Sequence, residues 1–141
     1  MERMNLEYEL IRKFNDRFQA RALNPIQEAY EKAGVGFGQR IRKLAEIPPQ
    51  ASFKESILAF HKFLADRLNL HGDILEIDES FAHICWKPPC FIGLDEAHLC
   101  DMVAVIDGAC ISGLSNRKVT CEVVRSVAKG ADVCELKYHA K

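Results

Sequence analysis

The spacing of apolar residues changes at Gly72, and this change constrains the fold of the chain more than any other feature. Before Gly72 the apolar residues recur every three or four positions, which is the period of one helix face. After Gly72 they alternate over two short segments, return to a helical spacing, and alternate again over two final segments. This order predicts an α+β fold of two layers, in which an antiparallel four-stranded sheet carries helices on one face.

Capping residues and prolines bound the expected elements. Ser52 and Glu55 have the spacing of a capping box, which marks the start of a helix. The proline pairs at 48–49 and 88–89 end the elements before them. Five helices are expected at about residues 6–18, 26–33, 37–45, 53–68 and 95–114, and four strands at 73–78, 81–86, 119–128 and 133–138.

A glycine run from Gly34 to Gly38 lies between two of these helices. A nucleotide-binding loop would need a preceding strand and a different glycine spacing, whereas the preceding segment has a helical pattern. We therefore interpret the run as a hinge, or as a place where two backbones pack closely.

Length and charge narrow the class of protein. The 141 residues fit one domain, with a helical part at 1–70 and a strand-strand-helix-strand-strand part at 71–141. Lys and Arg number 19 and Asp and Glu number 20, which gives a formal net charge of −1. Proteins that bind nucleic acid usually present a basic face, so nucleic acid is not an expected partner.

The sequence also argues against a membrane partner. No apolar run reaches the roughly 18–20 residues that a membrane span needs, and the N-terminus carries no apolar signal core. The expected location is therefore the cytoplasm, where thiols stay reduced.

In that compartment the six cysteines of the chain are not expected to form disulfides. They could be small apolar core residues, metal ligands or reactive thiols. No Cys-x-x-Cys pair is present, so spacing alone does not define a zinc site. The six are Cys85, Cys90, Cys100, Cys110, Cys121 and Cys134.

A catalytic Cys–His pair is one of these alternatives. Cys100 lies near the start of the helix expected at 95–114, and His98 precedes it by two residues. Residues two apart do not share a helix face, so His83, on the strand expected at 81–86, is a freer candidate for the base. His61, beside the apolar stripe of the helix expected at 53–68, is interpreted as an ordinary, partly exposed residue.

Two registers are possible for the last hairpin. A three-residue loop places Ser126 opposite Cys134 and Glu122 opposite Tyr138, so that Glu122, Ser126 and Cys134 share one face. A four-residue loop pairs Val127 with Cys134 and places Cys121 on the face of Cys134, because a one-residue slip exchanges the faces. We prefer the first, which keeps Arg125 from lying opposite Leu136.

Several short segments from Gly72 onward carry a family resemblance. They are His98–Asp101 on the helix, Gly108 and Gly113, and the turn from Val127 to Cys134; the earlier Gly34–Arg40 segment adds to them. With these residues the chain resembles the 4-vinyl-reductase-type domain, and also the family of 2-amino-thiazoline-4-carboxylate hydrolases. The resemblance implies a compact fold around a mostly apolar pocket for small aromatic or hydrocarbon-like molecules.

Some members that the chain resembles hold zinc beside the pocket. The resemblance places their helix Cys at Cys100, their final Cys at Cys134 and their Glu approximately at Glu122. The Cys expected before the last turn falls at Ser126, which is a poor zinc ligand, unless Cys121 takes its place. A zinc cofactor is therefore expected only if these residues come together.

The sequence thus favours a domain that binds an apolar or aromatic small molecule. Phe81, Trp86 and Val103 are expected in the wall of its pocket, together with His83, Cys85 and Cys100. One alternative is a small-ring hydrolase that uses Cys100 with His83 or His98. Another is a non-catalytic partner subunit, homodimeric through its N-terminal helices.

Overall fold

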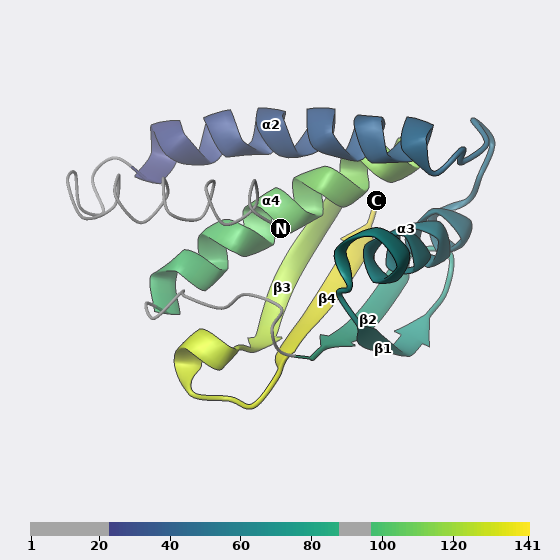
Figure 1. Ribbon diagram of the computed structural model, residues 1–141. Coiled ribbons are helices and arrows are strands. Elements are labelled where there is room, and N and C mark those ends of the chain that lie inside the picture. Colours follow the sequence, from purple (N-terminus) through teal and green to yellow (C-terminus); the bar gives the residue numbers. More distant parts are fainter. Residues whose placement is uncertain (1–22, 88–96) are drawn as a thin grey trace.

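The computed structural model describes residues 23–87 and 97–141, and within them the side chains of residues 27–87 and 104–141 (Figure 1). Four strands form one antiparallel sheet in the order β1-β2-β4-β3. The helices lie on one side of this sheet, and the α+β fold expected from the sequence is confirmed. The helix expected at 6–18 lies outside the described residues.

The described elements follow the predicted order. The helices are α2 (Leu23–Leu44), α3 (Phe53–Leu68) and α4 (Ala97–Ser115). The strands are β1 (Gly72–Ile77), β2 (Phe81–Trp86), β3 (Val119–Arg125) and β4 (Cys134–Ala140), with a 3₁₀ turn, η2 (Val127–Lys129), between the last two. No helix within the described residues is long and apolar enough to cross a membrane.

The sheet has an inner face, covered by helices, and an outer face. Along β2 the residues Ala82, Ile84 and Trp86 are buried, whereas Phe81, His83 and Cys85 on the opposite face are partly exposed. Helix α4 packs against β3, α3 lies over β2, and α2 rests on the far side of α4 (Figure 1). The core consequently lies between the inner face and the pair α3 and α4.

Helix α2 is continuous through the glycine run, so the expected division into two helices with a hinge is wrong. The alternative interpretation, close packing, is confirmed. A Cβ atom on Gly34 would lie 2.7 Å from Cβ of Ala109, and one on Gly38 would lie 1.9 Å from the Cys110 carbonyl oxygen. The two glycines are four residues apart, so they share the face of α2 that contacts α4.

The capping box of α3 forms as expected. The Ser52 hydroxyl accepts from the Glu55 amide at 3.2 Å, and the Glu55 carboxylate accepts from the Ser52 amide at 2.7 Å. Asn69 ends the helix in the left-handed conformation, with φ of 52°.

Both edge strands contain a β-bulge. The pairing of β1 with β2 shifts between Ile74 and Glu76, and the pairing of β3 with β4 shifts between Val123 and Arg125. The extra residues, Leu75 and Val124, are 54% and 42% exposed. The bulges leave the apolar residues on either side directed at the core.

The register of the last hairpin corrects our preferred prediction. Cys121 lies opposite Tyr138 and Glu122 opposite Lys137, so Glu122 is on the outer face while Cys121 and Cys134 are on the inner face. The connection is longer than either predicted loop, because Ser126 leaves the strand and caps η2. Its hydroxyl accepts from the Lys129 amide at 3.2 Å.

Candidate ligand site

A tryptophan and a tyrosine lie on the inner face, on the two central strands of the sheet. Trp86 is 4% exposed and Tyr138 is 1% exposed. Their strands, β2 and β4, are neighbours, and the indole of Trp86 forms a hydrogen bond with the Tyr138 hydroxyl. Burial raises the pKa of Tyr138 well above its ordinary value, so the phenol stays neutral and can donate or accept a hydrogen bond.

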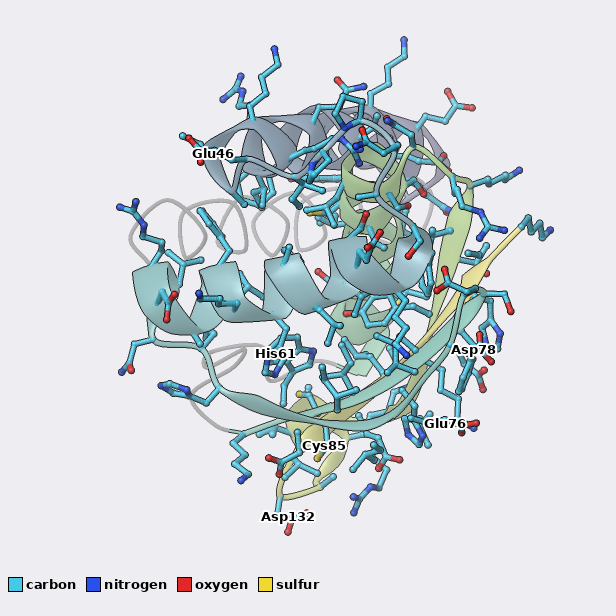
Figure 2. The ribbon with its side chains drawn as sticks, turned by 90° about the vertical axis from the view of Figure 1, so that its right-hand side faces the viewer. Glu46, His61, Glu76, Asp78, Cys85 and Asp132 are labelled. Atoms are coloured by element: carbon cyan, nitrogen blue, oxygen red, sulfur yellow. The ribbon has the colours of Figure 1, made fainter. Side chains whose placement is uncertain are left out.

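His61 joins this pair from the helix layer, on the side of α3 that faces the sheet (Figure 2). Its ring stacks on Trp86 with 5.6 Å between the ring centroids and an interplanar angle of 29°. Its Nε2 lies 2.7 Å from the Gly72 carbonyl oxygen. Because a carbonyl only accepts, Nε2 carries the proton and donates.

Asp107 is the only charged residue between Ala104 and Ser115 on α4. Burial, and to a lesser extent the Cys134 thiol, raises the pKa of its carboxyl from 3.8 to about 7. The carboxyl in turn acts electrostatically on Cys110, Cys121 and Tyr138. The next residue, Gly108, packs against the backbone of Val119 and Cys121, so this part of α4 lies over β3.

The thiols of Cys110 on α4 and Cys121 on the inner face of β3 are not activated nucleophiles. Burial is the main cause that raises the pKa of Cys110 and of Cys121, and the nearby Asp107 adds to it. On the outer face, burial and then Glu135 raise the pKa of Cys85. A reactive thiol needs the opposite shift, so these three thiols are protonated at neutral pH.

His83 is on the outer face and is engaged there. Its Nε2 lies 2.6 Å from Oε1 of Glu135, whose Oε2 accepts from Nε of Arg125 at 2.6 Å. The hydrogen bond from Arg125, followed by the one from His83, lowers the pKa of Glu135, although partial burial opposes this. Helix α4, which carries Cys100 and His98, lies against the other face, so the structure does not bring His83 toward Cys100.

The other predicted pocket residues of β2 also lie on different faces of the sheet. Trp86 lies on the inner face as expected, whereas Phe81 lies on the outer face, where its ring is 5.2 Å from that of His139. Phe81, His83 and Cys85 thus do not lie on the helix-covered face, and their contribution to a ligand pocket remains a prediction. The side chains of His98, Cys100 and Val103 lie outside the described residues.

The zinc ligands implied by the family resemblance do not fit together in the described part of the chain. Cys134 is on the inner face and Glu122 on the outer face, where Glu122 lies 3.6 Å from His139. Cys121 is opposite Tyr138, whereas Cys134 is opposite Trp86 at the other end of β4. No group of three His, Cys, Asp or Glu within the described residues is placed to hold a metal ion.

His61 and Asp107 were not identified as site residues from the sequence. His61 was set beside the apolar stripe of its helix, and its contact with Trp86 depends on how α3 crosses β2. Asp107 could have been recognised in the sequence, because an isolated carboxylate in an apolar helical stretch is rarely buried unless it has a polar partner.

No family model matches the chain, and no curated protein matches it significantly. Solved structures do match. The phenol-responsive sensory domain of the transcription activator PoxR, solved with phenol, has a TM-score of 0.67 and 13% identity, over 96% of this chain and 73% of that one. The fold is therefore a known one.

Two further structures share this fold. Trafficking protein particle complex subunit 3 from Naegleria fowleri, covalently bound to palmitic acid, has a TM-score of 0.63 and 12% identity, over 99% of this chain and 94% of that one. An H-NOX protein from S. oneidensis in the Fe(II)NO state has a TM-score of 0.55 and 14% identity, over 95% of this chain and 73% of that one.

Proposed function

We propose that this domain binds a small apolar or aromatic molecule between its inner sheet face and helices α3 and α4. The observation that carries the proposal is the set of polar and aromatic groups that meets inside an otherwise apolar layer: His61, Trp86, Tyr138 and Asp107. Small-molecule sites typically combine apolar and aromatic walls with a few polar groups that orient the ligand.

Two residues of the inner layer are only partly buried. Asp107 on α4 and Cys121 on the inner face of β3 both keep part of their surface accessible. We propose that the ligand lies in a space between α4 and β3, beside Cys121.

The shared fold supports the same function. The PoxR domain holds phenol and the trafficking subunit carries palmitic acid, and both ligands are largely apolar. A hydrolase that uses Cys100 with His83 is less well supported, because His83 is directed to the outer face, where its Nε2 contacts Glu135. A zinc ion is not part of the proposal.

The test uses Trp86, which is the only tryptophan of the chain and so reports on the inner layer. Phenol, toluene and palmitate are titrated while tryptophan fluorescence is recorded, and native mass spectrometry counts bound molecules. We expect saturable binding of at least one of these probes, with one molecule per chain. If none binds, the proposed function is wrong.

Matched variants locate the binding. Cys121→Leu fills the inferred space and is expected to weaken binding at least tenfold. Thr120→Leu places the same side chain on the neighbouring, exposed position of β3 and should leave binding unchanged. Circular dichroism checks that both variants stay folded. Equal affinity in the two variants would place the ligand elsewhere.

A further inference from the structure

The hydrogen bond between Trp86 and Tyr138 determines what the tyrosine can offer to a ligand, provided that the proposed binding site exists. An indole N–H can only donate, so the Tyr138 oxygen accepts this hydrogen bond. The hydroxyl therefore keeps its own proton, which is available for donation. The side chain is 1% exposed, so bulk water does not take up this proton.

The residues opposite Tyr138 on the neighbouring strands are poor acceptors for this proton. Ala82 of β2 and Cys121 of β3 lie opposite it, and a methyl group cannot accept a hydrogen bond while a thiol accepts only weakly. Asp107 on α4 acts on the phenol through its charge, whereas the hydrogen bond that acts on it comes from Trp86. A buried donor without an acceptor is costly, so an acceptor on the ligand would be favoured at this position.

The donor is also held in place beside the proposed ligand space. Cys121, which borders that space, lies opposite Tyr138 in the sheet. His61 stacks on Trp86 at 5.6 Å between the ring centroids and contacts the Gly72 carbonyl oxygen, which holds the indole. The indole in turn holds the phenol through their hydrogen bond. A group that is oriented before the ligand enters loses little freedom on binding, which favours affinity.

We propose that the ligand is a neutral carbonyl compound, such as a ketone or an ester, whose oxygen accepts the proton of the Tyr138 hydroxyl. A carbonyl oxygen accepts a hydrogen bond and brings no proton of its own, so it needs no second polar partner in an apolar layer. A hydroxyl head group would need a further acceptor for its own proton. A carboxylate would bring a negative charge near Asp107, which disfavours the ionised form of both groups.

The experiment compares three ligands that share a benzene ring. Ethylbenzene, acetophenone and benzoate are titrated at neutral pH into the full chain, and calorimetry measures their affinities. Ethylbenzene is the most apolar of the three and would bind most tightly if burial alone decided the affinity. We expect acetophenone to bind about tenfold more tightly than ethylbenzene, which is the effect of one buried hydrogen bond, and benzoate to bind most weakly.

The same titrations separate this inference from the proposed function. Ethylbenzene bound as tightly as acetophenone, or more tightly, overturns the carbonyl ligand and leaves the apolar site in place. Benzoate bound more tightly than acetophenone overturns the neutral head group. Failure of all three ligands to bind overturns the proposed function as well.

Tyr138→Phe isolates the hydroxyl, because it keeps the aromatic ring and removes the proton donor. The variant should bind acetophenone about tenfold more weakly and ethylbenzene with unchanged affinity. Tyr30→Phe makes the same change on α2 and should alter neither affinity. Circular dichroism checks that both variants stay folded. Equal affinity for acetophenone in the two variants contradicts the assignment of the donor to Tyr138.

The infrared spectrum of the bound ketone tests the hydrogen bond without any variant. A carbonyl that accepts a hydrogen bond stretches at a lower frequency than a free one. Acetophenone bound to the wild-type protein should therefore absorb at a lower frequency than acetophenone in hexane. A frequency equal to that in hexane would show that the carbonyl oxygen accepts no proton and would overturn the inference.

Discussion

Asp107 makes the stability of the fold depend on pH. Its pKa is about 7 in the folded protein and ordinarily 3.8, so between these values the folded chain binds more protons than the unfolded chain. The free energy of unfolding therefore falls as pH rises through this window, and the contribution of the neutral carboxyl is complete only below about pH 4. Glu135 acts in the opposite sense, because its lowered pKa stabilises the fold above its ordinary value and this stabilisation is lost in acid.

At the residue scale we predict that Asp107→Asn stabilises the protein at pH 8. At about 1.4 kcal/mol for each unit of pKa shift, the gain is at most roughly 4 kcal/mol, and it should vanish near pH 4. Urea unfolding followed by circular dichroism between pH 4 and pH 8 measures it. A parallel fall of both curves with rising pH would show that Asp107 is not the group responsible.

The sequence did not determine the positions of all the candidate site residues equally well. Trp86, Phe81 and His83 were all expected in the pocket wall, without use of the strand alternation. That alternation places Trp86 on the inner face and the other two on the outer face. The contact of His61 depends on how α3 is oriented over the sheet, which local patterns do not specify, whereas Asp107 could have been recognised as the lone charge in an apolar helical stretch.

The elements themselves were largely predictable, because each has a local signal. The capping box fixes the start of α3, and strand β2 has its predicted bounds. The division of α2 was wrong, because the glycines that interrupt its apolar pattern face α4 and are required there. The register of the last hairpin failed because Ser126 caps a 3₁₀ turn, which lengthens the connection.

At the element scale, two glycines of α2 should respond oppositely to the same substitution. A Cβ on Gly38 would meet the backbone of Cys110, whereas one on Gly36 would meet nothing within 4 Å. We expect Gly38→Ala to destabilise the protein by about 1–3 kcal/mol, as overpacking does. Gly36→Ala should stabilise it by about 0.5–1 kcal/mol, since alanine favours the helix. Thermal and urea unfolding measure both, and equal effects would contradict the described α2–α4 contact.

At the scale of the whole molecule, the homodimer expected from the sequence remains a prediction. Phe37 and Leu44 are two turns apart on α2 and are 40% and 70% exposed, so a second copy could cover them. We expect light scattering to give twice the chain mass of 16.0 kDa. The double substitution Phe37→Ser and Leu44→Ser should reduce this to one chain mass.

Leu58 provides the control for this prediction. It is 44% exposed on α3, and Leu58→Ser should leave the mass unchanged. A wild-type protein that is monomeric at tens of micromolar would show that no dimer forms through α2.

The two β-bulges have a consequence for how the molecule meets its own copies. An open sheet ends in strands whose free amide and carbonyl groups form a template on which another chain can polymerise. The bulges at Leu75 on β1 and at Val124 on β3 interrupt the regular spacing of these amide and carbonyl groups on both edge strands. A strand from another chain could therefore pair with an edge strand over only two or three residues on either side of the bulge. The bulges thereby oppose growth of the sheet at both edges, which agrees with the dimer predicted through the helical surface of Phe37 and Leu44.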